Sequence, residues 1–130
     1  MSPITNLSNG GLASNSGAHD IVADQGATFT YNIMYADAKR KAHNVTGYTA
    51  RMQLRATASS VEKVLELTTE NGRIAVDGAA GVFTLYVSAS DMTDTPPGVY
   101  VYDLEIEAPV TGFVERLMMG YFTVRSEVTR

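Results

Sequence analysis

A ten-residue run in which every second side chain is large and apolar constrains the fold of this chain more than any other feature. The alternation runs from Gly98 to Glu107 and places four large apolar side chains on one face: Tyr100, Tyr102, Leu104 and Ile106. Successive side chains of a β-strand point to opposite faces, whereas a helix repeats every 3.6 residues. Residues 98–107 are therefore predicted to form a strand with one buried face.

Further strand-like runs fill most of the remaining chain. They cover residues 19–23, 27–35, 48–55, 64–69, 73–77, 82–88 and 113–125. Together with residues 98–107 they predict about eight strands, at the spacing of a sandwich or a barrel. Asn71-Gly72 is predicted to close a short hairpin, because both residues accept positive φ. One helical turn is expected at residues 88–94, capped by Ser88 or Ser90.

A local motif before residues 98–107 narrows the choice of fold. Asp94-Thr-Pro-Pro-Gly98-Val-Tyr100 joins a short loop to a tyrosine at the start of a strand. In the tyrosine corner of immunoglobulin-like sandwiches, such a tyrosine donates a hydrogen bond back to the preceding backbone. We therefore predict an all-β, immunoglobulin-like sandwich of about 7–8 antiparallel strands. Tyr102 stands where an immunoglobulin domain would have its second cysteine.

The chain length fits one domain preceded by an arm. A chain of 130 residues has room for a single hydrophobic core. Residues 1–18 contain mostly Ser, Asn and Gly, with too few apolar side chains to offset the entropy of ordering them. We expect residues 1–18 to be a flexible N-terminal arm and residues 19–130 to be the sandwich.

Composition excludes several classes of function. The chain has no cysteine, which excludes disulfides, thiolate metal sites and cysteine nucleophiles. A net charge of -4 argues against a nucleic-acid partner. No stretch approaches the about 18 apolar residues of a membrane span, and the first residues lack the features of a secretory signal. Only 18% of residues are charged, which fits either contact with other chains or simply a β-rich composition.

No set of residues predicts a catalytic, cofactor or metal site. His19 and His43 lie in different segments, without metal-ligand spacing or a nucleophile elbow near either. Asp77, Asp91 and Asp94 lack the spacing of a calcium loop and are interpreted as solvated turn residues. A second row of acids is interpreted as a wet outer face, opposed across the sheet by Arg51 and Arg55: Asp103, Glu105 and Glu107. We expect no enzymatic activity and no cofactor.

Two segments are candidate interaction sites. Residues 113–125 carry apolar side chains on both faces, with Gly120 as the expected bulge. The predicted interface residues in this segment are Val114, Met118, Met119 and Tyr121. The basic run Lys39-Arg40-Lys41 either docks on an acidic patch of a partner or keeps a loop soluble, and both interpretations stand.

Four segments of the sequence resemble a known family. Residues 25–33 with 45–55 look like the opening of the phage baseplate upper protein N-terminal domain and its small stand-alone relatives. Residues 97–106 and 120–124 resemble the end of the same domain. The resemblance covers about residues 24 to 125 and departs at Lys39-Arg40-Lys41, where members often have an Asp-Gly hairpin. It implies a domain that fastens fibre or receptor-binding proteins to a phage tail or baseplate, without catalytic residues.

The sequence thus favours a non-enzymatic virion protein, made in the host cytoplasm and assembled into the tail or baseplate. Its expected partners are other phage virion proteins of tail, baseplate or capsid, and further copies of itself in an oligomer or ring; nucleic acid and membrane are not expected. A capsid decoration or head-to-tail joining protein is the first alternative. The alternative from another class is a carbohydrate-binding module that uses Tyr48, Tyr86 or Tyr121 as its platform.

Overall fold

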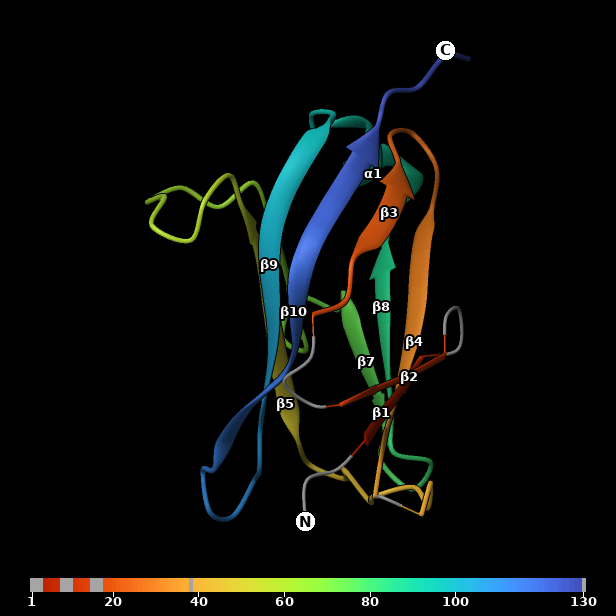
Figure 1. The fold of residues 1–130 in the computed structure, drawn as a ribbon, viewed down its shortest axis with the longest axis vertical. Helices are drawn as coiled ribbons and strands as arrows, with labels where there is room; N and C mark the ends of the chain where they lie inside the picture. The colour runs from red at the N-terminus through yellow and green to blue at the C-terminus, as the bar shows by residue number, and fades with distance from the viewer. Residues whose placement is uncertain (1–3, 8–10, 15–17, 38, 130) are drawn as a thin grey trace.

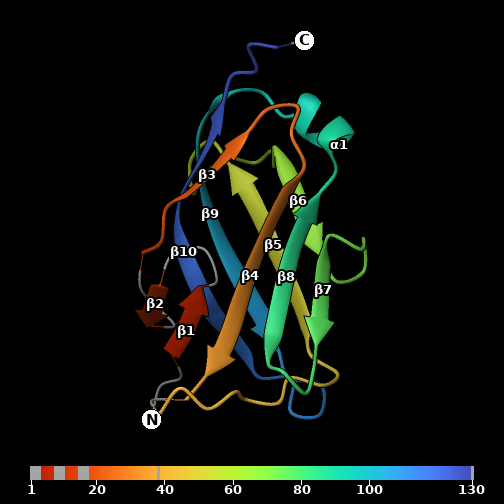
Figure 2. The ribbon, with the colours of Figure 1, turned by 90° about the vertical axis from the view of Figure 1, so that its right-hand side faces the viewer.

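Two five-stranded sheets face each other in the computed structural model, which describes residues 4–7, 11–14, 18–37 and 39–129 (Figures 1 and 2). The strands of the first sheet, in spatial order, are β2 (Gly11–Ser14), β1 (Ile4–Leu7), β4 (Phe29–Ala36), β8 (Val82–Val87) and β7 (Ile74–Asp77). Those of the second are β3 (Ile21–Asp24), β10 (Val114–Arg125), β9 (Gly98–Glu107), β5 (Thr49–Arg55) and β6 (Leu65–Thr68).

The connections give the predicted immunoglobulin-like sandwich. The orders β4-β8-β7 and β10-β9-β5 match strands B-E-D and G-F-C of immunoglobulin domains. Neighbouring strands are antiparallel except β3 and β10, which run parallel in a register that pairs Phe122 with Ile21. The described residues form ten strands where the sequence indicated about eight.

The two additional strands lie in the segment expected to be an arm. β1 and β2 form a hairpin, and β1 extends the first sheet by pairing Leu7 with Ile33 and Ile4 with Ala36. Backbone hydrogen bonds make this pairing, so it needs few apolar side chains, and the composition gave no sign of it. The rest of residues 1–17 lies outside the described residues, and the flexibility of the arm remains a prediction.

The alternation seen in the sequence becomes the core. On β9 the side chains of Leu104 and Ile106 are buried, whereas Val101, Asp103 and Glu105 lie on the outer face of the second sheet. The apolar side chains of both sheets meet in one cluster; its largest fully buried members include Ile33, Leu54, Leu67, Phe83, Leu85, Leu117, Met118 and Phe122. The predicted inward face of residues 98–107 and the strand predicted within residues 48–55 are confirmed.

One bulge in β10 sets which of its side chains face water. The register between β10 and β9 shifts between Arg116 and Met118, so Leu117 is the extra residue and both Leu117 and Met118 are fully buried. After the bulge the alternation resumes with the opposite parity. Met119 and Tyr121 therefore face outward while Phe122 and Val124 face inward.

The predicted bulge at Gly120 is wrong, because Gly120 pairs in regular register with Tyr102. Its lack of a side chain serves a close approach instead. The segment before β3 crosses Gly120, where the His19 N–H donates to the Met119 carbonyl over 2.6 Å. A Cβ on Gly120 would collide with the His19 backbone, and the Tyr102 hydroxyl donates to the His19 carbonyl from below.

The Asn71-Gly72 turn exists but is not a hairpin. It joins β6 of the second sheet to β7 of the first, so the strands on its two sides do not pair with each other. The Asn71 side-chain oxygen accepts the N–H groups of Thr68 and Arg73, and Gly72 has φ 78°. Local chemistry predicted the turn correctly, but the partners of each strand are decided by the packing of the whole sandwich.

The other two local predictions are confirmed. The helical turn α1 (Ala89–Thr93) is capped by Ser88, whose hydroxyl accepts the Asp91 N–H over 3.1 Å. The Tyr100 hydroxyl donates to the Pro96 carbonyl over 2.6 Å, which is the tyrosine corner. Both features lie at the end of the sandwich near the C-terminus (Figure 1).

Removal of the Tyr100 hydroxyl should destabilise the sandwich. We expect Tyr100→Phe to lower the free energy of unfolding by about 1 to 2 kcal/mol, because the hydrogen bond to Pro96 is lost. Urea unfolding followed by circular dichroism measures the change. Tyr86→Phe is the control, since Tyr86 is 46% exposed on the outer face of β8, and equal losses in the two variants would contradict a structural role for the corner.

Candidate protein-docking surface

The outer face of the second sheet has a concavity of about 780 Å³, which we call the outer groove. It lies over β10, β9 and β5 and reaches the segment before β3. Its lining consists of Ala18, Asp20, Arg51, Met52, Gln53, Arg55, Ala58, Val101, Tyr102, Asp103, Glu105, Arg116, Met119, Gly120 and Tyr121. The groove therefore combines apolar side chains with charges of both signs.

Apolar side chains continue from one side of the outer groove across three strands. We call this set the apolar strip: Val22, Val99, Val101, Met119 and Tyr121. Tyr121 pairs with Val101, and Thr123 lies between Val99 and Val22. Tyr121 is 56% exposed and Val99 61%. The outer face of an antiparallel sheet is ordinarily polar where it faces water, so this group of neighbouring apolar side chains indicates a contact surface.

At the other end of the groove, the acids of β9 lie opposite an arginine of β5. The Arg51 guanidinium contacts the Glu105 carboxylate at 3.0 Å and the Glu107 carboxylate at 3.4 Å. The hydrogen bond that Arg51 donates to Glu105, followed by the one it donates to Glu107, raises the pKa of Arg51. The predicted opposition of Arg51 to these acids is confirmed. Arg51, Glu105 and Glu107 thus form ion pairs with one another at this end of the face.

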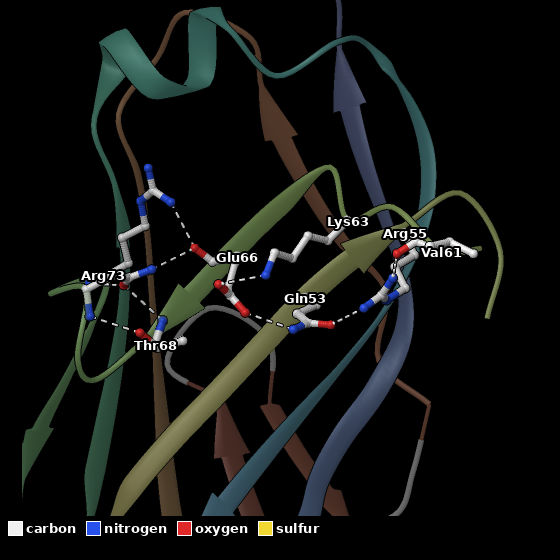
Figure 3. Close-up of polar contacts among 8 residues, drawn as sticks. Gln53, Arg55, Val61, Lys63, Glu66, Thr68 and Arg73 are labelled. Atoms are coloured by element: carbon white, nitrogen blue, oxygen red, sulfur yellow. Dashed lines mark hydrogen bonds and ion pairs between the residues drawn. The ribbon is translucent and has the colours of Figure 1, made fainter. Parts of the chain in front are cut away.

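Arg55, the second arginine predicted to oppose these acids, is engaged elsewhere. Its guanidinium donates to the carbonyls of Ser60 and Val61 and, at 2.7 Å, to the Gln53 side chain. Figure 3 shows how this series of polar contacts continues from Gln53 to Glu66 and from Glu66 to Lys63. The hydrogen bonds from Gln53 and Lys63 lower the pKa of Glu66. The polar groups of β5 and β6 thus largely satisfy one another.

Two charged groups of the outer groove, on the neighbouring strands β9 and β10, form no ion pair within the described part of the chain. Among the described residues, none forms a hydrogen bond or ion pair with the Asp103 carboxylate, and burial raises its pKa, helped by nearby Glu105 and opposed by Arg116. Arg116 contacts the Met119 sulfur at 3.0 Å but no carboxylate of the described residues at ion-pair distance. Asp103 and Arg116 thus lack a direct charged partner among the described residues, as do Asp20, which accepts the Tyr121 N–H, and Arg55.

The structure separates the residues that the sequence grouped as an interface. Met119 and Tyr121 lie together in the outer groove. Met118 does not, because the bulge turns it into the core with no exposed surface, so its prediction as an interface residue is wrong. Val114 is 44% exposed at the start of β10, outside the groove lining.

The basic run lies apart from the outer groove, in the loop between β4 and β5 at the end of the sandwich opposite α1 (Figure 1). The Asp37 carboxylate accepts the N–H groups of Lys39 and Lys41, each at 2.9 Å. Arg40 has φ 64°, a left-handed backbone held by this turn. All three basic side chains are exposed.

Sequence reasoning missed Val22, Val99 and Val101. The alternation correctly placed Val101 on the outer face, but an outward valine was treated as an ordinary surface residue. The signal available in the sequence was the presence of two outward valines, Val99 and Val101, on one strand. Their meaning depends on Tyr121 and Val22 lying beside them, which only the register of β10 and β3 reveals.

The remaining candidate groups do not converge on one site. Tyr86 is exposed on the first sheet and Tyr121 on the second, whereas Tyr48 packs against the core. His43 lies against the Tyr35 ring, and His19 lies beside β10. No group of three or more His, Asp or Glu in the described part of the chain could hold a metal ion. No helix in that part is long and apolar enough to cross a membrane.

Comparisons with known proteins assign no family. No protein-family model matches the chain, and no curated protein matches it significantly.

Because burial raises the pKa of Asp103, replacing its carboxylate with a neutral side chain should stabilise the folded state, and this effect should depend on pH. Above the native pKa the folded state has a charged, partly desolvated carboxylate, and below the unfolded pKa both states are neutral. Asp103→Asn should therefore raise the free energy of unfolding at neutral pH, and the gain should shrink as pH falls to about 3. Urea unfolding at both pH values measures it.

Asp24→Asn is the matched control, and it should change the free energy of unfolding in the opposite direction. The hydrogen bond from Arg125 lowers the pKa of Asp24, so its charged form contributes stability that is lost as pH falls. The control variant should be less stable than the natural chain at neutral pH. A loss of stability at neutral pH in Asp103→Asn would contradict the interpretation of that carboxylate.

Proposed function

We propose that this chain is a non-enzymatic structural subunit of a bacteriophage particle. It acts as an adaptor or accessory subunit of the tail or baseplate and assembles through protein–protein contacts. The resemblance of residues 24–125 to the baseplate upper protein N-terminal domain supports the place in the particle. The outer groove and the apolar strip support the mode of assembly.

The apolar strip is the observation that carries the proposal. It places exposed Val22, Val99, Met119 and Tyr121 on one rigid sheet face, next to half-buried Val101. Burial of apolar surface yields about 25 cal/mol for each Å² removed from water, so covering this face favours association. Tyr and Met are also side chains enriched at protein interfaces.

The basic loop supplies a second contact of a different kind. Lys39, Arg40 and Lys41 are held in a fixed turn by Asp37 and lie at one end of the sandwich. A rigid loop with three positive charges complements an acidic patch on a neighbouring virion protein. Such a contact would contribute to the rate of assembly and would weaken as salt concentration rises.

The described geometry gives less support to the alternatives. A capsid decoration protein or head-to-tail joining protein would use the same surface, so copy number in the particle decides between these places. A carbohydrate-binding module would need aromatic side chains on one platform, but Tyr86 and Tyr121 lie on opposite sheets.

The proposal is tested by quantitative mass spectrometry of purified particles of the phage that encodes the chain. We expect the chain in the particle at a small copy number relative to the major capsid protein, as for a symmetric ring in the tail or baseplate. A ratio near that of the capsid protein would place it on the head instead. Its absence from the particle would overturn the structural role.

Disruption of the apolar strip should prevent incorporation into particles. We expect Tyr121→Asp to reduce the copy number at least about tenfold, because a charge replaces an aromatic side chain at the centre of the contact. Tyr86→Asp is the matched control, with similar exposure on the opposite sheet. Circular dichroism checks that both variants fold, and equal incorporation of the two would contradict the role of the strip.

A further inference from the structure

We propose that the outer groove binds a second copy of this chain, with β9 of one copy facing β10 of the other across a two-fold axis that runs along the strands. The proposal deepens the proposed function: it takes from it only the claim that this surface docks a protein, and it names the partner.

The register of the two strands makes the face self-complementary. β10 and β9 lie side by side, and their outward side chains form four levels: Thr123 beside Val99, Tyr121 beside Val101, Met119 beside Asp103, and Arg116 beside Glu105. A two-fold axis between the strands, parallel to them, carries each member of a level over the other member in the second copy. Every level is therefore matched twice.

The charged levels favour this partner. Outward acids lie on β9, at Asp103 and Glu105, whereas the outward charge of β10 within the groove is Arg116. Within one copy Arg51 contacts Glu105, but Asp103 and Arg116 have no charged partner at ion-pair distance among the described residues. In the dimer, Arg116 of each copy reaches the Asp103 and Glu105 carboxylates of the other.

The apolar levels complete the match. Tyr121 of one copy lies over Val101 of the other, and the two valines of each β9 meet the Thr123 and Tyr121 side chains of the opposite β10. Because the axis runs along the strands, apolar levels meet apolar levels and charged levels meet charged levels. An axis perpendicular to the strands would instead place the apolar strip over Glu105 and Glu107.

The charge balance distinguishes a second copy from a strongly charged partner. The groove lining contains three carboxylates, Asp20, Asp103 and Glu105, and three arginines, Arg51, Arg55 and Arg116, so its formal charges cancel. A face whose formal charges cancel attracts neither a strongly basic nor a strongly acidic protein. The groove instead fits a surface with the same balance of acids and arginines, which a second copy related by a two-fold axis provides.

The face is large enough for a specific contact. β9 has 10 residues, which extend about 34 Å at the usual rise of a strand. The four strands from β3 to β5 add a width of about 19 Å at the usual strand spacing. The two copies together would cover about 1,200 Å², the lower bound of specific interfaces. Sheets packed face to face align within about 30° of each other, as a parallel two-fold axis requires.

Charge reversal followed by mixing tests the pairing. Sedimentation equilibrium of the natural chain over a concentration series should show a monomer–dimer equilibrium. Arg116→Asp and Asp103→Arg each place like charges opposite one another at both contacts of the dimer. Each variant alone should dissociate, with a dissociation constant at least about tenfold higher.

The mixture provides the rescue. A dimer of one Arg116→Asp chain and one Asp103→Arg chain has opposite charges at positions 116 and 103 in both contacts. An equimolar mixture should therefore form heterodimers at least about tenfold more tightly than either variant binds itself. Tyr86→Asp, on the opposite sheet, should dimerise normally. A monomeric natural chain, a dimer insensitive to both reversals, or a mixture that stays monomeric would each overturn the proposal.

These outcomes are separable from the proposed function. If the natural chain is monomeric but Tyr121→Asp is not incorporated into particles, the strip docks on a different virion protein and only the dimer fails. If the dimer forms and responds to the charge swap but the chain is absent from particles, the virion role fails and the dimer stands.

Discussion

The bulge at Leu117 is the constraint on which the candidate surface depends. A strand that alternated regularly from Val114 to Arg125 could not turn Glu115, Leu117, Phe122 and Val124 toward the same face, because the first two and the last two differ in parity. The extra residue resolves this conflict by placing Leu117 and Met118 in the core together. The same shift turns Met119 and Tyr121 toward water, beside the outward acids and valines of β9. Core packing thus determines the pattern of the outer face.

The surroundings of the bulge make that face rigid. The segment at His19 crosses Gly120 at a distance that excludes a Cβ, and it is held by the Met119 carbonyl and the Tyr102 hydroxyl. The Asp20 carboxylate then accepts the Tyr121 N–H over 3.0 Å. β3, β10 and β9 are therefore fixed to one another around the apolar strip. A preorganised face of this kind loses little conformational entropy when it binds.

Sequence reasoning reached the local features and failed where distant segments meet. The alternation of residues 98–107, the Ser88 cap and the Tyr100 corner depend on neighbouring residues, and all three were predicted. Whether Met118 or Met119 faces water depends on the bulge, which an alternation count alone does not locate. The strip also needs Val22 and Val99, separated by most of the chain and joined through Thr123. The pairing of β1 with β4 rests on backbone groups, which composition does not report.

Crosslinking between two differently labelled chains tests whether β9 of one copy faces β10 of another, because the natural chain has no cysteine to interfere. One chain carries Val101→Cys, the other Tyr121→Cys, and the mixture is treated with a short thiol-specific crosslinker. If Val101 of one copy lies over Tyr121 of the other, a covalent heterodimer forms in high yield, and little product forms when Tyr86→Cys replaces Tyr121→Cys. Equal yields with the two partners, or no heterodimer with either, would contradict this arrangement.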